Sequence, residues 1–274
     1  MSAIGQVNWS QVRAALRDVV PRVTDLLRSA DDPVAAALGE WNVAEVATHL
    51  SQAWELIPSL ARGESASPLP DMWALADMTK AAVRSGLERD LGVIAARIEA
   101  SAAEFERVLA SSDPDALGPW LVEGVKVPLR LFACHLLNEC LVHGYDIARA
   151  NRRPWGIDRA DAALVFEGFI FPLVASLAPR TLVHQGNAAR LGASYDLRLR
   201  GAGRAFLVFD DGMLTIEPPS SRTVDCHISA DPAALLLVSW GRRSQWAVVA
   251  TGRLLAWGRR PWLGPRLNSL IRTP

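Results

Sequence analysis

The stretch "PLRLFACHLLNECLVHGYDIARA", residues 128–150, decides how the first half of the chain folds. Its apolar residues recur at spacings of three and four, which is the pattern of an amphipathic helix. Within this pattern stand Glu139 and His143, four residues apart, and Asp146 follows three residues later. A spacing of four places two side chains on one helical face within about 6 Å of each other. Glu139 and His143 are therefore able to bind one metal ion.

His135, four residues before Glu139, extends the same row along the helix. At a rise of 1.5 Å per residue, His135 and His143 lie about 12 Å apart along the axis, so one ion cannot bind both of them with Glu139. A third ligand must come from another helix. Without one, the Glu139–His143 pair is equally explained as a surface ion pair or as a buried histidine bonded to a carbonyl group.

The remaining apolar patterns divide the chain into two parts. Helical spacing continues to about residue 178, in segments 12–27, 43–61, 87–110 and 160–177. From about residue 194 the helical spacing is replaced by short runs in which apolar and polar residues alternate, and these runs end in Gly, Pro and Asp-Gly turns. Asp231 and Pro232 mark the start of a helix in this part, because Asp caps helices and Pro suits their first position. The sequence predicts the α+β class, with a helical bundle at residues 1–180 and a small α+β domain at residues 181–274.

The amino-acid composition argues against some classes of binding partner and indicates a cellular compartment. The chain has 274 residues, half of them hydrophobic, with 29 basic and 29 acidic residues and no basic run. This balance argues against nucleic acid or a membrane as partner. The first residues lack the pattern of a secretion signal, no apolar stretch reaches about twenty residues, and the scattered Cys134, Cys140 and Cys226 suit a reducing compartment. We therefore expect a cytoplasmic protein, either a monomer or a homodimer.

A candidate for the third ligand lies in "EWNVAEVATHLSQAWEL", residues 40–56. Asn42 is placed to cap a helix, and Glu45 is placed to return the hydrogen bond as a capping box. His49 follows among apolar residues, where a histidine is more often a buried residue than a ligand. Together, however, His49, Glu139 and His143 form the set of two histidines and one glutamate that catalytic zinc sites use.

The two segments "WNVAEVATHL" and, about ninety residues later, "ECLVHGYDIA" resemble the mycothiol-dependent maleylpyruvate isomerase family. The family pattern is a tryptophan before a helix with His-Leu, followed by a later helix with Glu-x-x-x-His-x-x-Asp. The resemblance implies a DinB-like four-helix bundle in which His49, Glu139 and His143 bind a divalent metal, usually zinc. "ISADPAALLLVSWGRR" and "ATGRLLAWG" are similar to the sterol-carrier-like domain that follows the bundle in many members.

The same resemblance implies an enzyme whose cosubstrate is mycothiol, a small sugar thiol. A divalent cation favours the deprotonated form of a bound thiol, and the thiolate is the nucleophile. Addition to maleylpyruvate and elimination would give fumarylpyruvate, whereas a relative with another pocket would be a thiol S-transferase acting on small electrophiles. The alternative is a non-catalytic, metal-containing protein that binds a small molecule or a lipid.

Three further residues are candidates for the active site. Asp146 either accepts the free ring N–H of His143 or pairs with Arg149 on the helix surface. Arg242 and Arg243 either bind a carboxylate of substrate or thiol or lie at a solvated helix end. The resemblance favours Arg242 for the first role, because an arginine of this domain serves the active site in relatives. Four tryptophans either line a pocket for an apolar substrate or belong to the core: Trp54, Trp73, Trp120 and Trp246.

Overall fold

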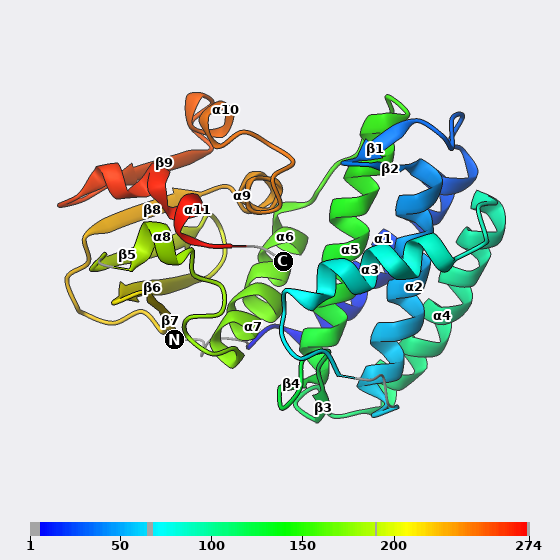
Figure 1. Cartoon of the computed structure of the whole chain (residues 1–274), viewed down its shortest axis with the longest axis horizontal. Helices are drawn as coiled ribbons and strands as arrows, with labels where there is room; N and C mark the ends of the chain where they lie inside the picture. Colours follow the sequence, from blue (N-terminus) through cyan, green and yellow to red (C-terminus); the bar gives the residue numbers. More distant parts are fainter. Residues whose placement is uncertain (1–5, 65–67, 190, 273–274) are drawn as a thin grey trace. The chain divides into compact units, whose positions relative to one another are not determined.

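A computed structural model of the chain describes residues 6–64, 68–189 and 191–272 (Figure 1). Contacts divide it into two compact units, Val7–Ile157 and the part that begins at Asp158. Long helices form the first unit and a five-stranded sheet lies in the second, which confirms the α+β class. Among the described helices, none has both the length and the apolar character needed to cross a bilayer.

The first unit is the expected four-helix bundle. Its long helices are α1 (Trp9–Arg28), α2 (Val43–Ala61), α4 (Leu91–Ser111) and α5 (Leu129–Ala150). Helices α1 and α2 each pack against both α4 and α5, and the shorter α3 (Ala74–Ser85) packs against α2. Two small antiparallel hairpins lead directly into α2 and α5: β1 (Ala36–Leu38) with β2 (Trp41–Asn42), and β3 (Leu117–Pro119) with β4 (Lys126–Pro128).

Local hydrogen bonds fix where these helices begin. The side chain of Asn42 accepts from the backbone N–H of Glu45 at 3.0 Å, and the Glu45 carboxylate accepts from the Asn42 N–H at 2.9 Å. This confirms the capping box predicted for α2. Helix α4 begins at Leu91, later than its apolar pattern indicated, because the Asp90 side chain caps it by accepting from the next free N–H groups.

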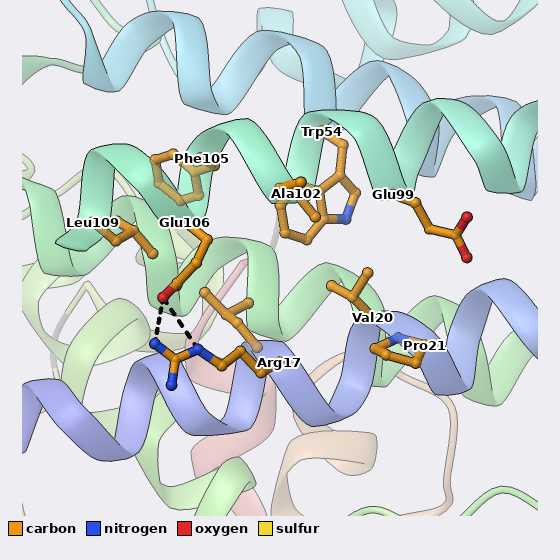
Figure 2. A pocket seen from close by; sticks show the side chains of 11 residues that line it. Arg17, Val20, Pro21, Trp54, Glu99, Ala102, Phe105, Glu106 and Leu109 are labelled. Atoms are coloured by element: carbon orange, nitrogen blue, oxygen red, sulfur yellow. Dashed lines mark hydrogen bonds and ion pairs between the residues drawn. The ribbon is translucent and has the colours of Figure 1, made fainter.

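A pocket of about 220 Å³ lies among α1, α2 and α4 (Figure 2). Trp54, which is 1% exposed, comes from α2, and Ala102 and Phe105 come from α4. The ion pair of Arg17 and Glu106 belongs to the same lining. Trp54 is thus a core residue that also borders this pocket, and whether the pocket takes an apolar substrate stays a prediction. None of the three candidate metal ligands is among the lining residues, so this pocket is separate from their site.

The second unit is built on a sheet with strand order β7-β6-β5-β8-β9, in which β5 and β8 are parallel and the other pairs are antiparallel. The strands are β5 (Ala193–Leu199), β6 (Arg204–Asp210), β7 (Met213–Glu217), β8 (Cys226–Ala230) and β9 (Leu254–Trp257). The helical elements are α6 (Arg159–Val165), the π-helical turn η1 (Phe166–Ile170), α7 (Phe171–Ser176), α8 (Gln185–Ala188), α9 (Pro232–Ser239), α10 (Gln245–Ala250), the 3₁₀ turn η2 (Pro261–Arg266) and α11 (Leu267–Leu270). As predicted, Asp231 caps α9 by accepting from the Ala234 N–H at 2.9 Å, and Pro232 takes the first position.

The structure places the division between the units at residues 157 and 158, whereas the sequence pattern placed it at residues 180 and 181. The difference is the segment 159–176, which is helical as expected but packs on the second unit. Helix α6 contacts α9, α7 contacts β7, and Arg159 Nε lies 2.7 Å from a carboxylate oxygen of Asp231. Apolar periodicity predicts that such a segment is a helix, but it does not identify the core on which the helix packs.

The central strand of the sheet carries a buried carboxylate. The side chain of Asp196 is fully buried and accepts from Arg198 Nε at 2.8 Å and from Arg204 Nη2 at 2.8 Å. His227 Nδ1 lies 2.6 Å from the same carboxylate. Burial alone would raise the pKa of Asp196, but these three donors hold it down to about 2.

We expect this cluster to make the stability of the protein sensitive to acid. Because the pKa of Asp196 is lower in the folded chain than the value of about 3.9 in an unfolded one, its ionised form stabilises the fold by about 2 kcal/mol above pH 4. That contribution is lost as the pH falls through 2. Urea unfolding of the wild type and of Asp196→Asn should therefore differ most at neutral pH and least near pH 2. A difference in free energy of unfolding that is the same at both pH values would contradict the prediction.

Candidate metal centre

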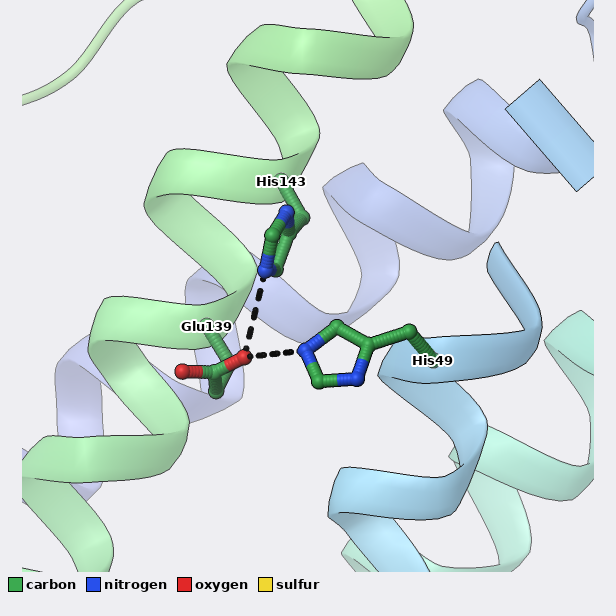
Figure 3. A group of neighbouring side chains, drawn as sticks. All are labelled: His49, Glu139 and His143. Atoms are coloured by element: carbon green, nitrogen blue, oxygen red, sulfur yellow. Dashed lines mark hydrogen bonds and ion pairs between the residues drawn. The ribbon is translucent and has the colours of Figure 1, made fainter. Parts of the chain in front are cut away.

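Two helices of the bundle bring three candidate ligands together. His49 projects from α2, and Glu139 and His143 project from consecutive turns of α5 (Figure 3). One possible ligand atom from each residue lies within 4.8 Å of the other two. The cap at Asn42 sets the start of α2 and thereby the position of His49 along it, while the spacing of four aligns the pair on α5.

The three side chains converge on one carboxylate oxygen. Glu139 Oε2 lies 3.2 Å from His49 Nε2 and 3.3 Å from His143 Nε2. A tetrahedral zinc ion with ligands at about 2.1 Å separates its ligand atoms by roughly 3.4 Å. These two contacts have nearly the separation that ligands of one ion require, and the candidate atoms of His49 and His143 lie within 4.8 Å of each other. The donor set of two imidazoles and a carboxylate also suits a divalent cation, so these residues fit the metal that the sequence pattern implies.

Burial and charge set the protonation of the site. Burial opposes ionisation of Glu139, but hydrogen bonds from His135, His143 and His49 hold its pKa well below the usual range. Burial lowers the pKa of His49 and favours its neutral, metal-binding form. It disfavours the charged form of His143 too, yet the carboxylates of Asp146 and Glu139 raise the pKa of that residue to about 9. Glu139 is therefore ionised, and a metal bound here would displace the proton that His143 carries at neutral pH.

The second ring nitrogen of His143 is also held. Its Nδ1 lies 3.1 Å from Oδ2 of Asp146, whose side chain is fully buried. Arg149 donates instead to the backbone carbonyl of Ala37 at 2.9 Å. The structure therefore has the first of the two arrangements that the spacing left open for Asp146. This bond presents Nε2 of His143 to Glu139, in the way that carboxylates orient the histidines of metal sites.

Two side chains beside the ligands were not assigned a role from the sequence. His135 Nε2 lies 3.2 Å from Oε1 of Glu139, on the side of the carboxylate away from the other two histidines. The ring of Trp41, just before α2, lies 5.5 Å from that of His49 between centroids. The spacing of four already placed His135 and Glu139 in one row on the helix, but it did not show that His135 contacts the second carboxylate oxygen.

Arg242 lies in the second unit, just after α9. Its Nη1 donates to the Trp240 carbonyl at 2.7 Å, and its backbone N–H donates to Leu237 O at 2.8 Å. Its role at the active site stays a prediction. The other three candidate tryptophans differ in burial: Trp120 is 3% exposed, Trp246 is 60% exposed, and Trp73 is intermediate.

All three cysteines are buried and form no disulfide. Cys134 and Cys140 lie on α5 itself, which is the helix that carries Glu139 and His143. Burial raises the pKa of the Cys140 thiol to about 12, so that thiol carries almost no thiolate at neutral pH. These positions suit packing residues rather than nucleophiles.

A close contact beside His143 packs the segment after α5 back against the helix. The ring of Trp155 lies so near Gly144 that an added Cβ atom would approach it to 2.2 Å. Trp155 Nε1 donates to the Leu141 carbonyl at 3.0 Å, and the Arg22 guanidinium lies 4.8 Å from the indole ring. Only glycine allows the indole to pack at this distance.

We expect Gly144→Ala to destabilise the protein, although alanine is favoured over glycine inside a helix by about 1 kcal/mol. The indole ring must move to admit the methyl group, and overpacking of this kind costs about 1 to 3 kcal/mol. Gly156→Ala is the matched control, because no atom lies within 4 Å of its added Cβ. Chemical denaturation should show a lower free energy of unfolding for Gly144→Ala than for Gly156→Ala, and equal values would refute the role given to the Trp155 contact.

Comparisons with known proteins identify a family and a similar fold. The family model of the mycothiol maleylpyruvate isomerase N-terminal domain matches residues 9–148, which run from α1 to α5 and include all three candidate ligands. A crystal structure of the mycothiol-dependent maleylpyruvate isomerase is similar, with a TM-score of 0.54, 13% identity, and coverage of 93% of this chain and 95% of that one. A structure of a histidine-to-alanine mutant of the isomerase gives a TM-score of 0.55 at 12% identity with the same coverage. No curated protein matches the sequence.

Proposed function

The chain belongs to the mycothiol maleylpyruvate isomerase family, and from that premise we propose that it is a metal-dependent enzyme of isomerisation or S-transfer. Its cosubstrate would be a low-molecular-weight thiol, mycothiol, and its substrate a small electrophile. The observation that supports this most is the convergence of His49, Glu139 and His143 inside the matched region. A reducing cytoplasm, in which such a thiol stays free, suits the three free cysteines.

In this proposal His49, Glu139 and His143 hold a divalent cation, with zinc preferred for its affinity for imidazole and carboxylate ligands. When bound there, the cation favours the thiolate form of the cosubstrate, which is the nucleophile. Asp146 keeps His143 in the tautomer whose Nε2 faces the site. Glu139 supplies the buried negative charge that the cation compensates.

The isomerisation balances without any further reactant. As the thiolate adds to the carbon–carbon double bond of maleylpyruvate, the π electron pair moves onto the adjoining carbonyl oxygen. The former double bond is then single and rotates. Return of the electron pair expels the thiolate and leaves fumarylpyruvate, so the thiol is not consumed. An S-transferase would differ only in retaining the new carbon–sulfur bond and taking up a proton.

Proton NMR of the metal-loaded protein with mycothiol and maleylpyruvate tests this proposal. Fumarylpyruvate as product identifies an isomerase, whereas a thioether formed from maleylpyruvate or from another small electrophile identifies an S-transferase. Binding of small molecules without turnover of any electrophile would contradict the proposal. That outcome would support the alternative, a non-catalytic metal-containing protein that binds a small molecule or a lipid.

We further propose that Arg242 binds a carboxylate of the substrate or the thiol. A charge-assisted hydrogen bond of this kind contributes about 1.5 to 3 kcal/mol, so Arg242→Ala should lower kcat/KM roughly 10- to 100-fold. The adjacent Arg243 is exposed to solvent and provides the matched control. Arg243→Ala should leave kcat/KM near the wild-type value, and equal losses in the two variants would remove Arg242 from the mechanism.

A further inference from the structure

We propose that His135 is a positioning residue that determines which oxygen of Glu139 is offered to the metal; the inference rests on the proposed metal site. The two carboxylate oxygens have different neighbours. Oε2 lies 3.2 Å from His49 Nε2 and 3.3 Å from His143 Nε2. Oε1 lies 3.2 Å from His135 Nε2, and the Asn138 amide donates to it over a longer 3.4 Å.

Because the contact between His135 and Glu139 is buried, water does not compete with it for the carboxylate. The side chains of His135 and Glu139 are 12% and 10% exposed, so water has little access to either. A carboxylate whose two oxygens are both available binds a metal through one oxygen or through both. With Oε1 accepting from both His135 and Asn138, its lone pairs are engaged, Oε2 remains for the metal, and Glu139 acts as a single donor. A second donated oxygen would take the coordination position that a thiol requires.

A hairpin of the same unit holds the ring of His135 in place. Trp120, which is 3% exposed, lies with its ring centroid 5.1 Å from that of His135 and 5.5 Å from that of Phe132. Trp120 follows strand β3, and its backbone N–H donates to the Val125 carbonyl at 2.8 Å. The connection between β3 and β4 therefore supports the imidazole that in turn orients Glu139. The imidazole cannot swing away from the carboxylate without disturbing this packing.

Two substitutions separate hydrogen bonding from packing. His135→Phe keeps a ring against Trp120 but removes the donor, whereas His135→Gln removes the ring but keeps an N–H donor four residues before Glu139. His184→Ala, which removes an exposed imidazole from the other unit, is the control. Zinc affinity is measured by competition with a chromophoric chelator, and the visible spectrum of the Co²⁺-loaded protein reports the coordination number.

We expect the dissociation constant for zinc to rise 10- to 100-fold in His135→Phe, as for other residues that orient metal ligands, and to stay near the wild-type value in His135→Gln and His184→Ala. The Co²⁺ spectrum of His135→Phe should shift towards a higher coordination number, because both oxygens of Glu139 become available. The opposite order, with tight binding in His135→Phe and weak binding in His135→Gln, would show a packing role and overturn the inference.

The remaining outcomes are also decisive. If the wild type binds no metal, the proposed metal site fails and the inference fails with it. If the wild type binds zinc and His135→Phe binds it equally well with an unchanged Co²⁺ spectrum, only the inference fails. Should His135→Phe not fold, His135→Leu takes its place: Leu and Gln both lack the ring, so weaker zinc binding in His135→Leu than in His135→Gln supports the N–H donor, and equal affinities contradict it.

Discussion

His49→Ala and His143→Ala proteins are expected to purify without metal while the helical bundle remains folded. Each substitution removes one of the three proposed ligands, and a pair of protein ligands holds a divalent ion far more weakly than three. The bundle does not depend on the ion, because the interior of α2 and α5 is largely apolar. Elemental analysis should give about one metal per chain in the wild type and close to none in either variant, with circular dichroism showing the same helix content.

Two control substitutions distinguish a metal ligand from a residue that only orients a ligand. Asp146→Asn should keep the metal but bind it roughly 10- to 100-fold more weakly, because Asp146 orients His143 without belonging to the ligand set. His184→Ala should retain full occupancy. A wild-type protein that is purified without chelator, contains no metal and takes up none on titration would show that the assignment of the three ligands is wrong.

Omission of the low-molecular-weight thiol should reduce turnover of the electrophile to the uncatalysed background. No cysteine of the chain is suited to replace that thiol, since all three are buried and burial raises the pKa of Cys140 to about 12. Removal of the metal with a chelator should have the same effect. Cys134→Ser and Cys140→Ser should keep most of the activity, and an absorbance assay of the electrophile measures all of these cases.

An undiminished rate of turnover without any thiol would indicate a different reaction. A three-ligand metal site also activates water, which would make the protein a hydrolase. Activity that survives chelation would instead show that the reaction does not use the cation. Loss of activity in Cys134→Ser or Cys140→Ser, with the fold and metal content intact, would assign the nucleophile to the chain itself.

The parts of the site that could be predicted from the sequence depend on local spacing. The Asn42 capping box is a property of neighbouring residues, and so is the shared face of Glu139 and His143 on one helix. Their meeting with His49 was inferred from the ligand set of catalytic zinc sites and from a family pattern, because nothing in either helix specifies its partner. The packing of Trp120 on His135 was not predicted, since it depends on how the hairpin of β3 and β4, which leads into α5, folds back against that helix.

The distance along the chain between His49 and Glu139, about ninety residues, gives the proposed ion a thermodynamic role as well as a chemical one. Ligands that meet only in the folded bundle make the ion a cross-link that the unfolded chain cannot form. At a free concentration of 100 times its dissociation constant, an ion that binds only the folded state adds about 2.7 kcal/mol to the free energy of unfolding. The melting temperature should therefore rise with the concentration of the ion. Melting temperatures measured at several ion concentrations would report how tightly the site binds it.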